Sequence, residues 1–517
     1  MPEPRVILQN PADDVAIAAT DIPAGVAVPL PAGPSAAAPR AVTARDAVAR
    51  GHKIALRDLP AGHAVLRYGQ IIGFTLSAIT TGDHVHVHNL AFGEFDRGPG
   101  DRAGAAPEPV SPDAGRATFR GYHRSDGTAG TRNYLGVLTS VNCSATAAKQ
   151  IAAQLRYSGM LDDYEHVDGV VALTHGQGCG MAGDGEGMTV LRRVMRGYLT
   201  HPNFGGFLVL GLGCEDNQIA ELTRGVPVRP DVPIVAATIQ ELGGTRKTVA
   251  EGVRLLEEML PEVNKARRHD MPANRIVLGT ECGGSDSYSG MTANPALGNA
   301  ADRLIRLGGT AILGETPEIY GAEHLLAGRA VSEEVARKLL ARIDWWREYT
   351  AKNGGTMDNN PSPGNKAGGL TTILEKSLGA VAKGGTTALA DVVEYAEPVT
   401  GPGLVFMDTP GYDPVSVTGL VAGGANVVCF TTGRGSAFGC APVPSIKLAT
   451  NTPLYEHMAE DMDINAGEIA DGTATIAGVG EEILARILAV ASGEPTKSEQ
   501  LGYGEPEFVP WHIGTVM

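Results

Sequence analysis

The chain has 517 residues, 43% of them apolar, which is typical of a protein with packed cores and about three domains. Its 42 basic and 58 acidic residues give a formal net charge of −16 without a basic face, so nucleic acid and anionic membrane surfaces are not expected as partners. The six cysteines are too few and too scattered for a disulfide framework, and no apolar run approaches the ~18 residues of a membrane span. We therefore expect a cytoplasmic protein whose cysteines stay free for metal binding or catalysis.

Residues 1–92 carry short apolar runs broken by glycine and proline, for example Val15 to Ala18 and Gln70 to Phe74. This pattern predicts a small all-β module with tight turns, and one helix near residues 44–50. The next stretch, residues 93–117, is rich in Gly, Pro, Ala and charge and lacks large apolar side chains. Such a composition predicts a linker.

Three histidines alternate near the end of this module, at His84, His86 and His88. The two-residue period of a strand would place all three side chains on one face. Closely spaced imidazoles can hold a metal ion, although a solvated strand that merely carries histidines has the same pattern. His52, beside a turn, is a further candidate for this site.

After residue 117 strand-like apolar runs alternate with helical patterns, which predicts parallel α/β units. A charged stretch near residues 260–269 separates two such parts, 118–268 and 269–517. The predicted fold class is α/β, with the all-β module followed by a two-part, Rossmann-like parallel α/β body. Helices are expected at residues 145–156, 187–199, 241–258, 332–350 and 478–492, and strands at 310–314, 404–407 and 426–430.

Four cysteines share one kind of position, directly after a short apolar run that is typical of a buried strand. They are Cys143, Cys179, Cys214 and Cys282. Because ligands bind in the crevice at the carboxyl ends of parallel strands, the four could share one site. His175 and Glu215 accompany them, and thiolate, imidazole and carboxylate together suit iron or zinc. Simple burial of small side chains is the alternative.

Two neighbouring loops within residues 281–295 combine glycines with short polar side chains. Glycine lets backbone N–H groups approach a ligand closely, and short polar side chains can bind hydroxyl or carboxylate groups. Turn formation and the start of a helix explain some of the same residues. We predict Ser285, Asp286 and Asn294 as substrate-binding residues.

Two further loops carry cations. Residues 360–366 form a stiff, proline-rich loop that leads into a helix, so that Asn365 and Lys366 lie near a helix N-terminus. A cation there opposes the helix dipole, which suits the lysine to anion binding or proton abstraction. Thr432 and Arg434 follow the strand at 426–430, where an arginine between glycines can bind a carboxylate with two N–H groups. A solvated turn arginine is the alternative. No dinucleotide or phosphate-loop motif occurs, so nucleotide cofactors are not expected.

Together these motifs resemble those of the altronate and galactarate dehydratase family, in the same order and over nearly the whole chain. They are Gly51-His52-Lys53, residues 83–89, Gly121-Tyr122, Asp126-Gly127, residues 130–133, residues 211–215, 281–286, 292–295, 361–366 and 432–435. The resemblance implies an amino-terminal SAF-type β-clip module and iron-dependent removal of water from a sugar acid to give a 2-keto-3-deoxy acid. Residues 83–89 and 317–323 look more like altronate than galactarate dehydratases. Residues 435–439 depart from the family's Gly-Thr-Pro-Tyr-Gly, which leaves the exact substrate open.

Dehydration of a 2,3-dihydroxy acid requires removal of the C2 proton, stabilisation of an enediolate and protonation of the departing C3 hydroxyl. A divalent metal stabilises the charge by several kcal/mol, and positioned acids and bases add about 10²–10⁴-fold in rate. We predict Lys366 or His175 as the base, the other or Glu215 as the acid, and Arg434 as the carboxylate ligand. Further substrate contacts are predicted for Thr432, Ser285, Asp286, Asn294, Asn365 and His52. Metal ligands are predicted among Cys143, Cys179, Cys214, Cys282, His86 and His88.

The expected metal is Fe²⁺, with Mn²⁺ or another divalent ion as alternatives, and a homodimer is expected. Three other functions stay open besides a galactarate or other sugar-acid dehydratase. A sulfolactate sulfo-lyase uses the same proton abstraction, but the fusion of the β module to the body favours a dehydratase. An iron–sulfur hydro-lyase would hold a cluster on three or four of the cysteines. A sugar-acid-binding protein would keep the fold without turnover.

Overall fold

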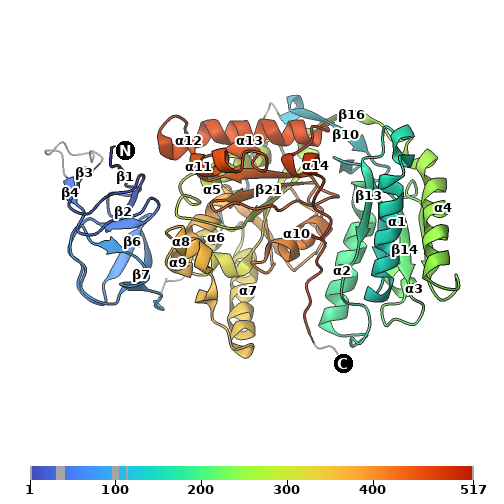
Figure 1. The fold of residues 1–517 in the computed structure, drawn as a ribbon, viewed down its shortest axis with the longest axis horizontal. Helices are drawn as coiled ribbons and strands as arrows, with labels where there is room; N and C mark the ends of the chain where they lie inside the picture. Colours follow the sequence, from blue (N-terminus) through green and yellow to red (C-terminus); the bar gives the residue numbers. More distant parts are fainter. Residues whose placement is uncertain (1–2, 31–40, 96–103, 112–113, 515–516) are drawn as a thin grey trace.

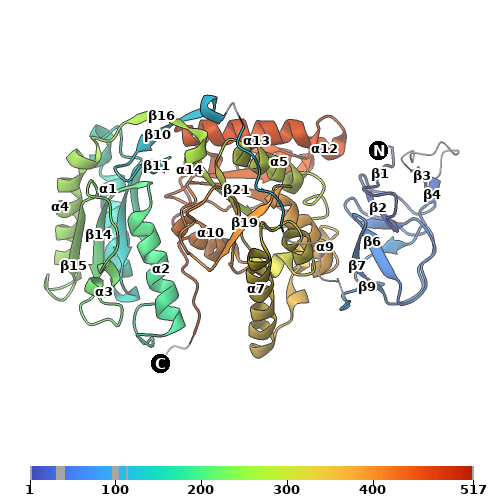
Figure 2. The same ribbon diagram turned by 180° about the vertical axis from the view of Figure 1, so that it is seen from behind.

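The computed structural model describes residues 3–30, 41–95, 104–111, 114–514 and 517, so parts of the predicted linker lie outside the described residues. Three parts follow one another along the long axis (Figures 1 and 2). We call residues 1–92 the β module, 118–268 the second domain and 269–517 the C-terminal domain, which lies between the other two. The predicted fold class is confirmed, because an all-β module precedes two parallel α/β sheets. In the described residues no helix is both long and apolar enough to cross a membrane.

The β module consists of short antiparallel strands around its own apolar core. The helix predicted near residues 44–50 is wrong: Val48 instead pairs with Ile22 in an antiparallel bridge, which buries both side chains. The strands are β1 (Val6–Ile7), β2 (Val15–Ala18), β3 (Ala27–Pro29), β4 (Ala41–Thr43), β5 (Lys53–Ala55), β6 (Ala64–Arg67), β7 (Gln70–Thr75), β8 (His84–Val85) and β9 (Leu90–Ala91).

The second domain contains a parallel four-stranded sheet in the order β13-β12-β14-β15. Helices α1 and α4 pack on one face, and α2 packs on the other, where its apolar side joins a core shared with α10 of the C-terminal domain. The elements are β12 (Tyr134–Thr139), α1 (Ala145–Tyr157), β13 (Gly169–Leu173), α2 (Glu186–Thr200), β14 (Phe204–Gly211), α3 (Ile219–Thr223), β15 (Ile234–Thr238) and α4 (Thr245–Val263).

The C-terminal domain is built on a parallel seven-stranded sheet in the order β19-β20-β18-β17-β21-β22-β23. Its strands are β17 (Val277–Cys282), β18 (Thr310–Leu313), β19 (Leu389–Val393), β20 (Gly403–Met407), β21 (Val427–Thr432), β22 (Ser445–Ala449) and β23 (Ile464–Asn465). Its helices are α5 (Ala293–Arg306), α6 (Glu323–Ala327), α7 (Glu333–Lys352), α8 (Pro363–Ala367), α9 (Ile373–Ala380), α10 (Asp413–Ala422), α11 (Thr452–His457), α12 (Glu468–Asp471), α13 (Ile476–Ala491) and α14 (Lys497–Leu501). The small antiparallel sheet of β10 (Thr118–His123), β11 (Ala129–Gly130) and β16 (Arg268–Pro272) connects it to the second domain.

A buried ion cluster attaches the β module to the C-terminal domain. Lys53 Nζ lies 2.9 Å from both carboxylate oxygens of Glu375, and Arg67 Nη1 lies 2.6 Å from one of them. Burial alone would raise the pKa of Glu375, but Lys53 and Arg67 hold it at about 2. Burial lowers the pKa of Lys53 to about 8, which still leaves it charged at neutral pH. The cluster therefore fixes β5, and with it the neighbouring His52, against the C-terminal domain.

Candidate active site between the β module and the C-terminal domain

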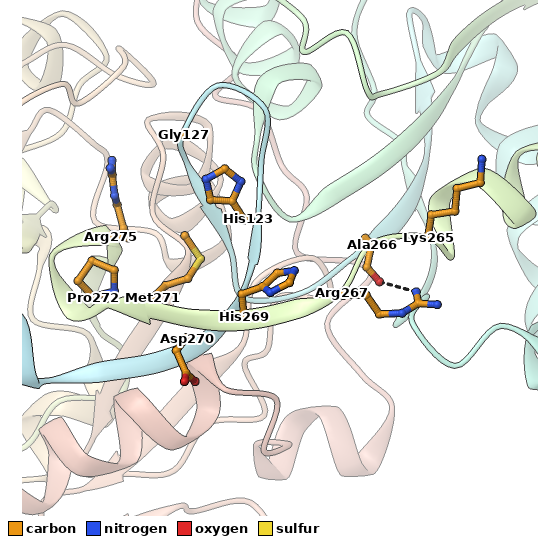
Figure 3. A pocket seen from close by; sticks show the side chains of 10 residues that line it. All are labelled: His123, Gly127, Lys265, Ala266, Arg267, His269, Asp270, Met271, Pro272 and Arg275. Carbon is orange, nitrogen blue, oxygen red and sulfur yellow. Dashed lines mark hydrogen bonds between the residues drawn. The ribbon is translucent and has the colours of Figure 1, made fainter.

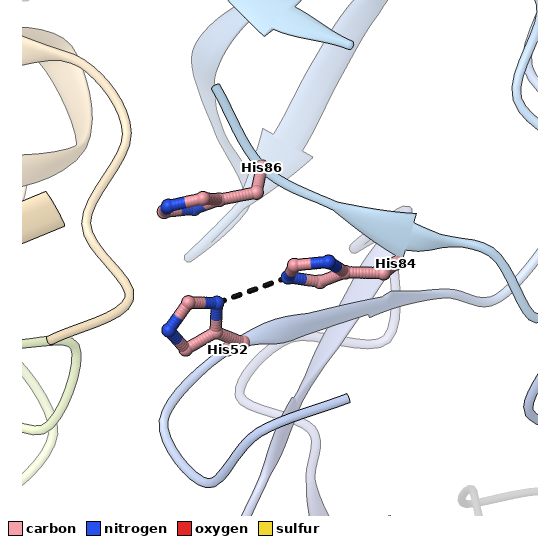
Figure 4. A group of neighbouring side chains, drawn as sticks. All are labelled: His52, His84 and His86. Atoms are coloured by element: carbon pink, nitrogen blue, oxygen red, sulfur yellow. Dashed lines mark hydrogen bonds between the residues drawn. The ribbon is translucent and has the colours of Figure 1, made fainter. Parts of the chain in front are cut away.

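Three histidines of the β module converge on one point (Figure 4). His52 Nδ1 lies 2.9 Å from His84 Nε2, and the rings of His84 and His86 stack with centroids 5.5 Å apart. Each residue offers a ring nitrogen, and these three nitrogens lie within 4.8 Å of one another. The group therefore has the spacing of ligands around one metal ion.

This group differs from the alternating set predicted on a single strand. β8 ends at Val85, because Asn89 closes a turn: its side chain accepts from the backbone N–H of His86 and donates to the carbonyl of His84. His88 therefore lies outside the group of three, and His52 takes its place. The His88 ring stays near the group, 5.3 Å from the ring of His84.

The histidines are held as neutral imidazoles. Burial lowers the pKa of His84 to about 4 and that of His86 to about 3, with smaller contributions from neighbouring cationic groups. Burial also lowers the pKa of His52. Neutral imidazole is the form that binds metals. The Nδ1 atom of His86 is buried and has no hydrogen-bond partner among the described residues, an arrangement that costs free energy unless something binds it.

Opposite the histidines lies the short helix α8. His52 Nε2 is 3.3 Å from the carbonyl oxygen of Ala367 at the end of this helix. Ser362 and Asn365 form a reciprocal capping box, and Asn365 also donates to the carbonyl of Ser285 after β17. Lys366 lies in the last turn of α8, and not near a helix N-terminus as the sequence predicted. Within the described residues its ammonium group has no hydrogen bond or ion pair, and it is half-buried.

Arg434 lies on the same side of the sheet, directly after β21. Its backbone N–H donates to the carbonyl of Gly284, 2.8 Å away, and its side chain is exposed. A Cβ on Gly368 would lie 3.2 Å from Cδ of Arg434, so the arginine stem packs against the end of α8. Its guanidinium, like the Lys366 ammonium, makes no hydrogen bond or ion pair in the described part of the chain. Two unpaired cations thus border the loop that His52 contacts.

The other predicted substrate-binding residues support these loops. Asp286 accepts hydrogen bonds from Ser289, Thr450 and Asn451, and burial raises the pKa of its carboxyl. Asn294 donates to the carbonyl of Gly379 and accepts from Thr431. The Thr432 hydroxyl accepts from the N–H of Gly435. Ser285 differs, since its hydroxyl is buried and has no partner among the described residues.

Comparison with known proteins covers nearly the whole chain. Family models described as "Altronate/galactarate dehydratase SAF domain", "D-galactarate dehydratase/Altronate hydrolase, second domain" and "D-galactarate/Altronate dehydratase, C-terminal" match residues 4–92, 121–264 and 273–516. "Altronate dehydratase" of Bacillus subtilis is 37% identical over 465 residues, covering 90% of this chain and 92% of that one. "Galactarate dehydratase (L-threo-forming)" of Escherichia coli is 38% identical over 465 residues, 88% of each. The chain belongs to the D-galactarate/altronate dehydratase family.

Membership of the dehydratase family confirms the predictions of an enzyme and of a carbon–oxygen lyase, and supports a sugar-acid dehydratase. A more distant relative, "(2R)-sulfolactate sulfo-lyase subunit beta" of Chromohalobacter salexigens, is 31% identical over 394 residues, which cover 75% of this chain and 96% of that one. The predicted family is thus confirmed, and the sulfo-lyase reaction that the sequence left open is the one named for this more distant relative.

The residues present fit the metal that the dehydratase resemblance implies. His52, His84 and His86 supply three neutral nitrogen donors at one point, and the unpartnered nitrogen of His86 is satisfied if a cation binds there. Imidazole suits iron and other divalent transition metals. The fit is to the group of three histidines rather than to a mixed set of cysteines and histidines.

A second buried group lies in the C-terminal domain, and of its members only Cys282 was predicted as a metal ligand. Cys282 lies with Glu315 and Glu318, and their ligand atoms lie within 4.8 Å of one another. Two lysines compensate these acids: Lys376 Nζ is 2.7 Å from Glu318, and Lys383 pairs with Glu315. Lysine and glutamate within the apolar stretch of α9 were a signal for such a buried ionic group.

The structure places four cysteines on two different sheets, which corrects the prediction of one shared crevice. Cys143, Cys179 and Cys214 follow β12, β13 and β14 of the second domain, whereas Cys282 ends β17 of the C-terminal domain. The second domain and the β module lie at opposite ends of the molecule (Figure 1). Within one chain the three second-domain cysteines therefore do not join His86 or His88.

His175 and Glu215 also lie in the second domain, away from Lys366. His175 is buried, which lowers its pKa to about 4; its Nε2 donates to the carbonyl of Thr139 and its Nδ1 accepts from the N–H of Gln177. Glu215 accepts from the hydroxyl of Ser140 and from the N–H of Gly213. Both side chains hold loops of the second domain together.

A separate hollow of about 610 Å³ lies beside β16 (Figure 3). Its cationic side chains do not converge: Lys265 pairs with Glu262, and Arg267 donates to the carbonyl of Ala266. Arg275 and Asp270 point away from each other. We therefore assign no function to this hollow.

Proposed function

We propose that this protein dehydrates a sugar acid, altronate in the first place, to a 2-keto-3-deoxy acid at the site between the β module and the C-terminal domain. One observation carries the proposal: a group of three neutral histidines lies beside α8, which bears Lys366, and the unpaired Arg434 packs against the end of the same helix. Galactarate or another sugar acid is the nearest alternative substrate. The motifs at residues 83–89 and 317–323 support altronate.

The chemistry assigns one role to each cation. Arg434, exposed at the end of β21, binds the substrate carboxylate through two N–H groups. Lys366 in its unprotonated form removes the C2 proton, and the resulting ammonium delivers that proton to the C3 hydroxyl, which leaves as water. The enol product then ketonises. His175 and Glu215 stay predicted acid–base residues without an assigned step.

His52, His84 and His86 would hold the divalent metal, proposed to be Fe²⁺ with Mn²⁺ as the alternative. When bound, such an ion stabilises negative charge that develops on the substrate carboxylate. The buried ionic contact of Lys53 with Glu375 keeps His52 beside α8. The metal site therefore stays next to the helix that carries Lys366.

The proposal is tested with a panel of aldonic and aldaric acids, incubated with iron-loaded protein and assayed for 2-keto-3-deoxy acid. We expect the fastest turnover with altronate. Faster conversion of galactarate would identify galactarate, and not altronate, as the preferred substrate. Release of sulfite from (2R)-sulfolactate without any keto-deoxy acid would overturn the dehydratase proposal and favour the reaction named for the more distant relative.

A further inference from the structure

Three cysteines of the second domain are exposed at one edge of its sheet. Cys143, Cys179 and Cys214 follow β12, β13 and β14, and these strands are direct neighbours in the order β13-β12-β14. Their exposure is specific, because Cys282, Cys429 and Cys440 are all buried. Free cysteine is ordinarily among the most buried residues, and exposed thiols are open to oxidation. Three exposed thiols at adjacent strand ends therefore indicate that this edge of the sheet binds a ligand.

The three cysteine loops are held together by hydrogen bonds. The N–H of Asn142 donates to the carbonyl of Gln177, and the N–H of Asn217 donates to the carbonyl of Gly178, each at 3.0 Å. The side-chain amide of Asn217 also donates to the carbonyl of Ser140. A Cβ on Gly178 would lie 2.3 Å from that same carbonyl oxygen, so only glycine allows this approach. The loops therefore hold their thiols in fixed relative positions.

The backbone around these thiols suits an anionic ligand. Gly178 and Gly180 flank Cys179 with φ of +101° and +67°, and Gly213 precedes Cys214 with φ of +127°. Successive N–H groups in such conformations form concave anion sites, which occur around iron–sulfur clusters. In the described part of the chain the N–H groups of Cys179, Gly180 and Cys214 donate no hydrogen bond. The amide of Gln240 donates to the sulfur of Cys214, 3.5 Å away.

The three sulfurs are not grouped closely enough to serve together as ligands of a single ion. The three do not all lie within 4.8 Å of one another, the distance that brings the histidines of the β module together. In a cluster each thiolate binds a different iron, so its sulfurs stand farther apart than those around one ion. We propose that the second domain binds an iron–sulfur cluster through Cys143, Cys179 and Cys214. One iron of a four-iron cluster then stays open to an oxygen ligand.

A cavity of about 700 Å³ lies beside two of the cysteine loops, and the three cysteines themselves are not among the residues that line it. Asn142 and Gln177, neighbours of Cys143 and Cys179, line it, together with Lys149. The Oε1 atom of Gln177 is buried and has no partner among the described residues. A cation and an unpartnered amide suit a small hydroxy acid. This site is distinct from the one proposed for dehydration, and the inference does not depend on it.

The test is anaerobic reconstitution of the full chain with Fe²⁺ and sulfide, followed by iron and sulfide analysis and visible absorption. We expect about four irons and four sulfides per chain and a broad visible absorption, as for a cysteine-bound four-iron cluster. Cys143→Ser, Cys179→Ser and Cys214→Ser should each lose most of this iron. Cys429→Ser, at a buried position in β21, should keep it. Thermal unfolding of all four variants checks that they fold.

Full cluster content in the triple serine variant would overturn the proposal, as would one bound ion per chain without sulfide in the wild-type protein. Because these readouts do not involve turnover, they separate this inference from the dehydratase proposal. Loss of the cluster with folding intact supports it even where dehydration of altronate persists.

Discussion

At the scale of single residues, the site is defined by which polar groups stay unpaired. Asp286, Asn294 and Asn365 are buried and bind neighbouring loops, whereas the charged ends of Lys366 and Arg434 bind nothing in the described part of the chain. Both cations can reach solvent, so they are free to bind an anionic ligand beside the histidines. The two cations are therefore the residues whose replacement should affect turnover most directly.

Replacement of Lys366 by methionine should lower kcat by about 10²–10⁴-fold, because it removes the proposed proton carrier. Replacement of Arg434 by glutamine should raise KM by about 10–100-fold, the loss expected for a hydrogen-bonded charge. Lys352→Met, at the exposed end of α7, is the matched control and should leave both constants unchanged. Steady-state kinetics on altronate measures these effects. Normal turnover of Lys366→Met would remove Lys366 from the mechanism.

Metal content distinguishes the observed histidine group from the one that the sequence pattern predicts. His52→Ala and His86→Ala should each lose most of the bound divalent metal after dialysis against trace chelator, whereas His88→Ala should retain it. These measurements use protein in which Cys143, Cys179 and Cys214 are replaced by serine, so that elemental analysis reports only metal bound at the histidine group. Retention in His52→Ala together with loss in His88→Ala would contradict the assignment.

At the scale of elements, the sequence patterns predicted helices and strands well and predicted short turns poorly. The helical patterns correspond to α1, α2, α4, α7 and α13, because an apolar face must repeat along a long helix to reach the core. The alternating pattern wrongly grouped His88 with His84 and His86, because the chain turns shortly after β8 ends at Val85. A two-residue period does not mark where a strand ends. The meeting of His52 with His84 depends on strand pairing across the module, which local patterns do not contain.

The buried contact between β5 and α9 should set the stability of the β module on the C-terminal domain. Glu375→Gln leaves Lys53 and Arg67 buried with a neutral partner, which should lower the free energy of unfolding by about 3–5 kcal/mol. Glu251→Gln, in the exposed pair with Arg254 on α4, should leave stability unchanged. Chemical denaturation curves compare the two. An equal effect of both substitutions would show that the buried contact has no special role.

The same contact predicts an acid dependence of stability. The pKa of Glu375 is held at about 2, below its ordinary value of 4.5. A carboxyl group whose pKa is lower in the folded state stabilises the fold fully above its ordinary pKa, and that contribution is lost as the pH falls through the folded value. The difference in stability between wild type and Glu375→Gln should therefore shrink between pH 4.5 and 2. A difference that stays constant over this range would contradict it.

At the scale of the whole molecule, strand-end residues could be predicted, but their grouping into sites could not. The apolar runs before the four cysteines marked true strands, yet those strands belong to two sheets, whose relative placement depends on contacts such as the packing of α2 against α10. The histidines of the β module and Lys366 come together across more than 270 residues of sequence, through the contact of His52 with Ala367. Such long-range contacts depend on the domain arrangement, which spacing along the chain does not determine.

This arrangement predicts that the β module and the body act as separable parts. The sulfo-lyase relative is named as a beta subunit and covers only 75% of this chain, so division of the chain has a precedent among related proteins. If the chain is cut between residues 95 and 104 and both pieces are co-expressed, a tag on the β module should copurify the body. The reason is that Glu375 accepts from two cations of the module, and Thr372 donates to the carbonyl of Ile72.

The matched variants decide whether that buried contact is responsible. Glu375→Gln should release the body from the tagged module, because two buried cations would lose their counterion on association. Arg5→Ala removes hydrogen bonds from an exposed arginine to the carbonyls of Ala470 and Asp471 at the rim, where water can replace them, and should leave copurification intact. Elution of the wild-type module alone would mean that the covalent linker, and not the buried ionic contact, holds His52 beside Lys366.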